Sequence, residues 1–210
     1  TCEHRLYPKD LFPIFSWVFL GGKCRYCKEK ISPRYLIVEA IVGVSGVLLY
    51  HFYTLPQAGL LFAVFCILLC ITLIDADTME IPDSLNVAIV LCGILAIFAF
   101  PEVSLLSRVI GIFAISVPLF LISLFIAGAF GFGDVKLMLG AGFLLGWQHE
   151  LVGFFIALIL GGIYGAALLI RKKKGGKDHF AFGPCLAVGI FAALLTGQEL
   201  IDWYLALMHL

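Results

Sequence analysis

Two acidic motifs hold the side chains best suited to chemistry in this sequence. The first runs from Leu73 to Asp83 and carries four carboxylates within nine residues, directly after a long apolar run. The second runs from Gly131 to Lys136 and reads Gly-Phe-Gly-Asp-Val-Lys, so a single Asp follows two glycines between two apolar runs. A carboxylate at the edge of a lipid-buried helix is energetically costly, which makes both motifs candidate functional sites.

If the two motifs meet in the fold, their carboxylates can form an acid–base pair. Two neighbouring carboxylates do not both ionise easily, so one keeps its proton as a general acid while the other deprotonates a water molecule. Asp134 is the only carboxylate of the second motif. In the first motif Asp75 ranks above Asp83, because Asp83 follows a proline and precedes a serine, a pattern typical of a helix start. The alternative is that these acids are solvated helix caps.

Other residues of the motifs are expected to support the pair. Glycines beside Asp134 allow backbone angles that other residues resist, and they let an extended substrate strand lie against the carboxylate. The supporting residues that we predict are Gly131, Gly133, Asp77, Asp83 and Lys136.

The elements that position these motifs are apolar helices. The sequence of 210 residues is 62% hydrophobic and 13% charged, whereas a soluble domain carries about 25% charged residues. We therefore predict an all-α, polytopic membrane protein with a lipid bilayer as its environment. About seven transmembrane helices are expected, at 35–53, 58–74, 85–100, 105–130, 135–147, 151–170 and 182–196.

Basic residues predict which side of the membrane each loop faces. Lys and Arg collect at Arg5–Arg34 and at Arg171–Lys177, and such clusters mark the cytoplasmic side. Six predicted spans separate the two clusters, and an even number returns the chain to the same side. The loops that carry the acidic motifs then face the cytoplasm. The net charge of zero argues against a nucleic-acid partner, which would need a surplus of Lys and Arg.

Cys24 and Cys27 suggest half of a structural zinc site. They stand at two-residue spacing in a basic segment that we expect to be cytoplasmic and reduced, and zinc prefers four thiolate or imidazole ligands. One pair supplies only half of these ligands, and chance spacing is the simpler alternative. A secreted disulfide framework does not fit seven cysteines, several of which lie in apolar runs.

Taken together, these motifs resemble those of the type 4 prepilin peptidases, which are bacterial membrane aspartyl proteases of the GxGD type. The resemblance covers nearly the whole chain: it rests on Ile74–Asp83 and Gly131–Lys136, and extends to the segments at 10–17, 22–27, 31–39 and 182–184. It implies that Asp75 and Asp134 are catalytic. The glycine motif alone also resembles that of the presenilin and signal peptide peptidase type of intramembrane protease, which is a weaker match.

The resemblance also implies substrates, cofactors and a location. The expected substrates are prepilins or pseudopilins, cut after the Gly that ends a short basic leader, at the cytoplasmic face of the bacterial inner membrane. Many relatives then methylate the new N-terminus with S-adenosylmethionine. The family's bacterial members carry two cysteine pairs, and Cys2 falls where the second cysteine of the first pair stands. Its partner would lie upstream, which suggests a truncated chain in which zinc is either lost or completed by a substitute ligand such as His4. If the chain is native, a site of three cysteines and His4 is the alternative.

The sequence predicts three parts: a cytoplasmic segment at 1–34, a transmembrane protease domain at 35–197 and an interfacial helix at 198–210. A proton- or cation-coupled transporter is the alternative function, but the acids stand at helix ends rather than at mid-membrane, and we find no internal repeat. A zinc-tethered scaffold without catalysis is a further alternative, and it would tolerate the loss of Asp134.

Overall fold

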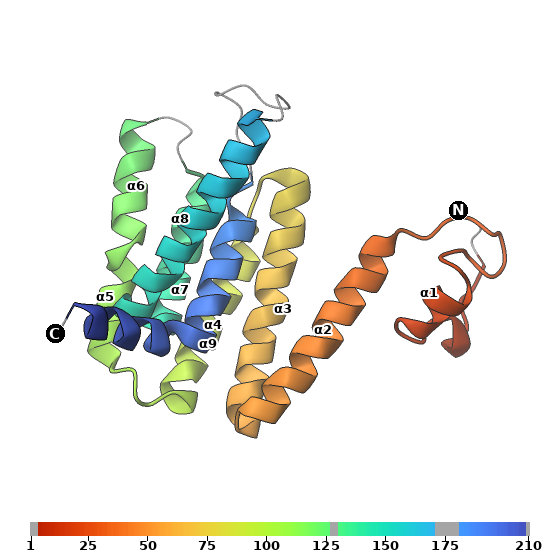
Figure 1. Ribbon diagram of the computed structural model, residues 1–210, viewed down its shortest axis with the longest axis horizontal. Coiled ribbons are helices and arrows are strands. Elements are labelled where there is room, and N and C mark those ends of the chain that lie inside the picture. Colours follow the sequence, from red (N-terminus) through yellow and green to blue (C-terminus); the bar gives the residue numbers. More distant parts are fainter. Residues whose placement is uncertain (1–3, 127–129, 171–180, 209–210) are drawn as a thin grey trace. The chain divides into compact units, whose positions relative to one another are not determined.

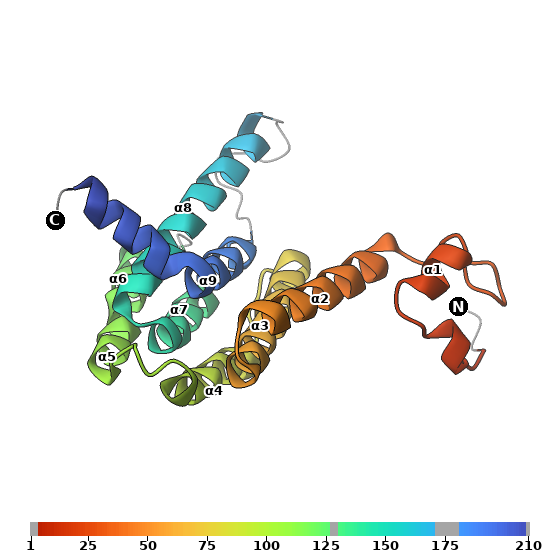
Figure 2. The ribbon, with the colours of Figure 1, turned by 60° about the horizontal axis from the view of Figure 1, so that its bottom comes forward.

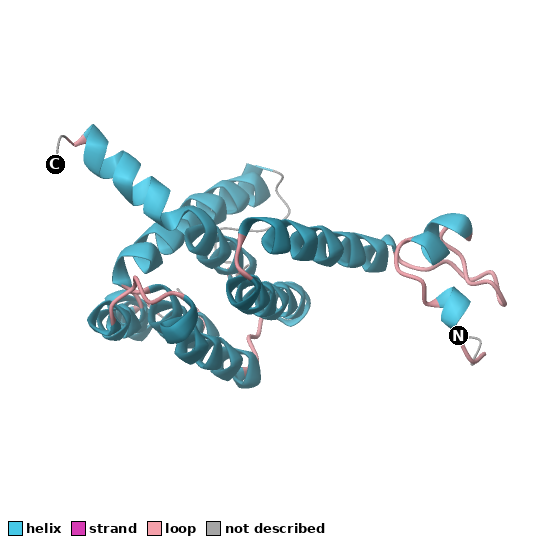
Figure 3. Ribbon diagram, turned by 90° about the horizontal axis from the view of Figure 1, so that it is seen from below, coloured by secondary structure: helices cyan, strands magenta, loops and turns pink. Residues whose placement is uncertain are grey.

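The computed structural model describes residues 4–126, 130–170 and 181–208. These residues form helices joined by turns and loops (Figure 3). Within the described ranges, the only β-type pairing is an isolated antiparallel bridge between Lys23 and Lys30. The all-α prediction is confirmed.

The chain divides into two compact units, and the first extends to Ala58. It contains a 3₁₀ turn at Pro8–Asp10, the short helix α1 at Phe15–Phe19 and the long helix α2 at Pro33–Phe52. Ser32 caps α2 by accepting a hydrogen bond from the backbone N–H of Arg34, which satisfies one of the free donors at a helix start.

The second unit, from Gly59 onward, holds most of the apolar helices. Its helices are α3 (Leu55–Thr78, whose first turn belongs to the first unit), α4 (Asp83–Ala99), α5 (Leu105–Ala114), α6 (Ser116–Phe125), α7 (Phe132–Leu145), α8 (Trp147–Ile170) and α9 (Gly183–Leu207).

Five helical segments are long and apolar enough to cross a membrane. They are α2, α3, the combined segment Leu105–Phe125, α8 and α9. The prediction of about seven spans was slightly too high: α4, with 17 residues, is at the lower limit of length for a crossing, and α7 has only 14.

Helix α7 forms the centre of the second unit. It contacts α4, α5, α6, α8 and α9, and most of its residues are buried (Figures 1 and 2). A short helix surrounded in this way is shielded from lipid by its neighbours. The Asp134 motif forms the start of α7, so the close packing of this central helix fixes the position of the motif.

Helices α8 and α9 pack closely through glycine. A side chain at Gly189 would collide with the backbone carbonyl of Gly153, and small residues at such crossings let two helix backbones approach in lipid. The α9 helix continues without interruption from Gly183 to Leu207. The described part of the segment predicted at 198–210 therefore belongs to the same helix, although it runs in a different direction from the first part of α9 (Figure 1).

Candidate active site

The two acidic motifs meet at one end of the second unit. The end of α3 and the starts of α4, α7 and α9 all lie at the upper end of this unit in Figure 1. A cavity of about 450 Å³ opens there. Its lining comes from both motifs and consists of Asp75, Met79, Glu80, Ile81, Asp83, Gly131, Phe132, Gly133, Asp134 and Lys136.

Asp75 lies in the last turn of α3 and is 5% exposed. Its carboxylate Oδ2 accepts a hydrogen bond of 2.9 Å from the backbone N–H of Gly183, the first residue of α9. The side chain is thus held by a helix that starts 108 residues later in the chain. A buried carboxylate that is fixed by a backbone donor has a defined orientation toward the cavity that it lines.

Asp134 lies in the first turn of α7 and is 8% exposed. Its Oδ2 accepts a hydrogen bond of 3.1 Å from the backbone N–H of Gly131. The start of a helix favours a negative charge, because the first backbone N–H groups point out of the helix end. Asp134 therefore serves as a helix cap and lines the cavity at the same time.

The carboxylates of Asp75 and Asp134 line the same cavity and interact electrostatically. Both are largely removed from water, which makes it costly to charge both at once. One protonated and one ionised carboxyl group on the wall of the same cavity is an arrangement that suits general acid–base hydrolysis. The geometry therefore supports hydrolytic chemistry at this cavity.

The two glycines of the second motif act differently from the sequence interpretation. Gly131 has an extended backbone at φ −73° and Gly133 lies in the first turn of α7, so the expectation that they need unusual backbone angles was wrong. Gly133 is needed for space: a Cβ there would lie 3.0 Å from the Cβ of Ile81. The missing side chain lets the second motif pack directly against the loop of the first.

Asp83 and Lys136 join the two motifs across the cavity rim. The Lys136 ammonium donates to both carboxylate oxygens of Asp83, at 2.8 and 3.0 Å. Asp83 is the first residue of α4, as its place after Pro82 suggested. Both side chains are more than half exposed. The predicted supporting residue Asp77 is exposed in the last turn of α3 and is not among the residues that line the cavity.

Apolar side chains form part of the cavity wall. Met79 and Phe132 line it, and both are more than half exposed. Met79 also has a positive φ of 57°, a conformation that is uncommon for residues other than glycine and that ends α3 abruptly. The site therefore offers an apolar surface beside its acids.

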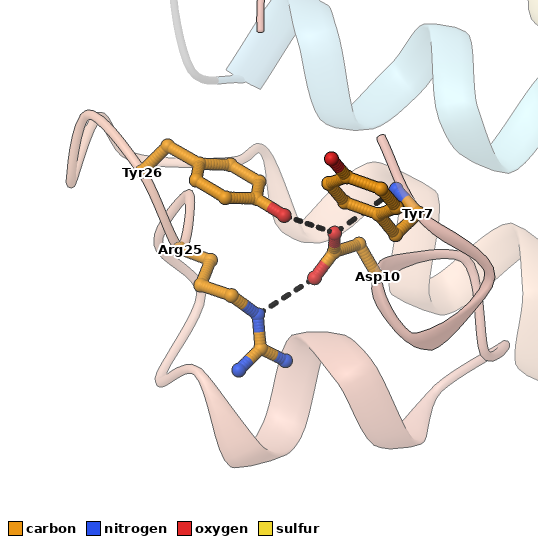
Figure 4. A network of polar contacts seen from close by, with 4 residues as sticks. All are labelled: Tyr7, Asp10, Arg25 and Tyr26. Atoms are coloured by element: carbon orange, nitrogen blue, oxygen red, sulfur yellow. Dashed lines mark hydrogen bonds and ion pairs between the residues drawn. The ribbon is translucent and has the colours of Figure 1, made fainter. Parts of the chain in front are cut away.

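In the first unit, Asp10 organises the loop that holds the cysteine pair. Its side chain is 4% exposed and accepts hydrogen bonds from the Arg25 guanidinium at 2.6 Å, the Tyr26 hydroxyl at 2.8 Å and the Tyr7 backbone N–H at 3.1 Å (Figure 4). Burial alone would raise the pKa of Asp10, but these hydrogen bonds outweigh it and leave the pKa below its ordinary value. Arg25 and Tyr26 are the two residues between Cys24 and Cys27, so the hydrogen bonds to the buried Asp10 side chain hold this loop in place.

The cysteine loop has the shape of a tight turn. The Cys24 N–H donates to the Glu29 carbonyl, and the Lys28 N–H donates back to the Cys24 carbonyl. Among the described residues, no group of three or more His, Cys, Asp or Glu side chains could hold a metal ion. Cys2 lies outside the described residues. The ring of His4 packs against Tyr26. Zinc binding at the Cys24–Cys27 pair therefore stays a prediction.

A buried arginine was missed by the sequence interpretation. Arg108 lies in α5 and is fully buried. Its guanidinium donates to four carbonyl oxygens near the ends of α4 and α7, which belong to Ala96, Phe100, Phe143 and Leu144. The signal that could have identified it is a cation within an apolar run, because such residues must find partners inside the bundle.

Comparison with known proteins gives consistent family matches. The model of the type IV leader peptidase family matches residues 60–166, and that of the bacterial peptidase A24 N-terminal domain matches residues 1–53. A prepilin leader peptidase/N-methyltransferase from Stutzerimonas stutzeri is 32% identical over all of this chain and 74% of its own length. An enzyme of the same name from Pseudomonas aeruginosa is 33% identical over 97% of this chain and 72% of its own length. Another from Neisseria gonorrhoeae is 34% identical over 92% of this chain and 69% of its own length. No solved structure matches significantly.

These matches agree with the geometry. The family model spans both acidic motifs and the helices that carry them, and the relatives align with nearly the whole chain. Neither the family description nor these names support a transport activity. The chain is therefore a membrane peptidase that belongs to the type IV leader peptidase family.

Proposed function

We propose that this protein removes the leader peptide from prepilins or pseudopilins, with Asp75 and Asp134 as its catalytic pair. The observation that carries the proposal is the shared cavity, into which two distant motifs each bring one buried carboxylate. Its support from relatives is the name that they share, prepilin leader peptidase/N-methyltransferase.

The proposed reaction is direct hydrolysis of one peptide bond. The ionised carboxylate takes a proton from water, the water oxygen attacks the scissile carbonyl carbon, and the protonated carboxyl group gives its proton to the leaving nitrogen. No covalent intermediate is needed. The apolar side chains of Met79 and Phe132 suit a substrate whose hydrophobic helix follows the cut.

We place the cavity at the cytoplasmic face of the bacterial inner membrane. A substrate with a basic leader in the cytoplasm and an apolar helix in lipid presents its junction at that surface, after the Gly that ends the leader. The rim of the cavity includes Glu80 and Asp83, and their charges complement a basic leader. The basic segment Arg171–Lys177, on which the orientation also depends, lies outside the described residues.

Methylation of the new N-terminus is a second proposed activity, and it follows from the relatives' names. S-adenosylmethionine would supply the methyl group. The described residues offer no feature that assigns a site for this donor, so we derive no step through it.

The direct test is a cleavage assay. The purified full-length protein in lipid nanodiscs is incubated with a peptide made of a basic leader, a Gly and an apolar helix, and the products are identified by mass spectrometry. We expect one cut after the Gly, and no product from the Asp134→Asn variant. Intact peptide after prolonged incubation with the unmodified protein would rule out the proposed function.

A further inference from the structure

One hydrogen bond to Asp75 comes from outside both acidic motifs. The donor is the backbone N–H of Gly183, 2.9 Å from Oδ2 of Asp75. We propose that Gly183 is a positioning residue for catalysis: its N–H holds the Asp75 carboxylate in place, and its missing side chain leaves the room that the carboxylate occupies. The proposal rests on the proposed function, because it assigns a third part to the same active site.

The space around Gly183 requires a glycine. A Cβ at this position would lie 2.6 Å from Oδ2, 2.9 Å from Cγ and 3.2 Å from Cβ of Asp75. Non-bonded carbon and oxygen atoms do not approach that closely, so any side chain at 183 pushes the carboxylate away from its donor. Gly183 therefore supplies the N–H donor to Asp75 and, because it has no side chain, leaves the space that the Asp75 carboxylate occupies.

The direction of α9 adds to this effect. Asp75 stands in the last turn of its own helix, where the exposed carbonyl ends disfavour a negative charge. The start of α9 favours a negative charge, because its first N–H groups carry partial positive charge. The start of α9 therefore offsets the unfavourable effect of the end of α3 on an ionised Asp75.

Phe182 fixes the position of this donor. Its ring packs against Phe130, with 5.5 Å between ring centroids, and it occupies the space where a side chain at Gly161 of α8 would stand. Pro184 follows Gly183 in the first turn of α9, a place that suits proline because its missing N–H is not needed there. The Phe-Gly-Pro string thereby anchors the helix start on α8 and leaves the Gly183 N–H directed at Asp75.

The test is Gly183→Ala in the full-length protein, assayed with the leader–Gly–helix peptide. We expect kcat to fall by about tenfold to a hundredfold, which is the value of a hydrogen bond to a charged group, with KM and the melting temperature close to those of the unmodified protein. Gly189→Ala in the same helix is the structural control. Its clash is with Gly153, so we expect a lower melting temperature and an unchanged kcat of the folded protein. Gly162→Ala, whose Cβ meets nothing within 4 Å, should change neither.

A second variant isolates the donor itself. Replacing residue 183 by glycolic acid turns the peptide N–H into an ester oxygen without adding a side chain, and kcat should again fall while KM holds. Wild-type kcat in this ester variant, or a rise in KM alone in Gly183→Ala, would overturn the positioning role while leaving the proposed function intact. Failure of the unmodified protein to cleave the peptide would overturn both.

Discussion

Asp75 and Asp134 are buried to a similar degree, and each accepts one backbone N–H. They differ in the helix end on which they stand: Asp75 ends α3, whereas Asp134 begins α7. The exposed acids nearby do not share this environment, since Asp77 is open to solvent and Asp83 is paired with Lys136. Burial together with a backbone donor is therefore what separates the proposed catalytic carboxylates from their neighbours in sequence.

Replacing either proposed catalytic acid with Asn should stop peptide cleavage. Asn has nearly the size of Asp but supplies neither a proton acceptor nor a proton donor of the required strength, so we expect kcat to fall by about three orders of magnitude or more. Asp77→Asn is the matched control in the same helical turn, and it should retain most of the activity. The measurement is the initial rate of peptide cleavage at equal amounts of folded protein. Full loss in Asp77→Asn together with activity in Asp75→Asn would move the catalytic role to Asp77.

At the scale of elements, the ends of α4 and α7 depend on one side chain from a third helix. Arg108 in α5 donates to carbonyls at both ends, and the last carbonyls of a helix have no partners within the helix itself. The carbonyls of Ala96 and Phe100 also accept the backbone N–H groups of Phe100 and Val103. The acceptors that depend most on Arg108 are therefore those of Phe143 and Leu144, and a buried acceptor that loses its donor is the costly half of removing a hydrogen bond.

Arg108→Leu should therefore lower the free energy of unfolding by roughly 2–4 kcal/mol. Lys136→Leu is the comparison, because it also removes one cation but from an exposed pair, which is worth about 1 kcal/mol or less. Reversible unfolding in mixed micelles measures both values. Equal losses in the two variants would show that the Arg108 hydrogen bonds do not hold the helix ends together.

Zinc binding by the loop that holds Cys24 and Cys27 can be tested without an activity assay. If Cys24 and Cys27 bind zinc together with further ligands, metal analysis of the purified protein should give about one zinc ion per molecule. Replacing both cysteines with Ser should remove it, while replacing Cys66 and Cys70 in α3 should not. A purified protein that carries no zinc would contradict the predicted site, and the loop would then be held by the hydrogen bonds of Asp10 without a metal.

Local patterns predicted most elements, and long-range contacts account for what they missed. Apolar runs placed most helices to within a few residues, although the helix expected at 182–196 continues to Leu207 and the span expected at 105–130 is divided into α5 and α6. The acidic motifs were found because carboxylates are rare beside such runs. The bond between Gly183 and Asp75 was not predictable, because no spacing rule links residues 108 positions apart. The packing of Gly133 on Ile81 and the carbonyl partners of Arg108 depend in the same way on how helices meet.

At the scale of the whole molecule, the second unit has two ends with different roles. The acidic motifs lie at the end where α3 finishes and α4, α7 and α9 begin, and the loop between α4 and α5 lies at the opposite end (Figure 1). Positive charge is scarce in this unit outside the segment Arg171–Lys177, apart from Arg108 and Lys136. The orientation of the protein in the membrane therefore depends on that segment and on the basic N-terminal part of the chain.

Cysteine labelling can determine the orientation independently of catalysis. Thr78 ends α3 beside the cavity and Glu102 lies in the loop after α4, and both are exposed. In a background without native cysteines, Thr78→Cys should resist an impermeant thiol reagent on intact cells and react in inverted vesicles, because the basic segments predict that this face lies in the cytoplasm. Glu102→Cys should show the reverse pattern. If Thr78→Cys were labelled from outside, the cavity would open away from the cytoplasm. The basic leader of a prepilin could not reach it there, and the proposed substrate would lose its physical basis.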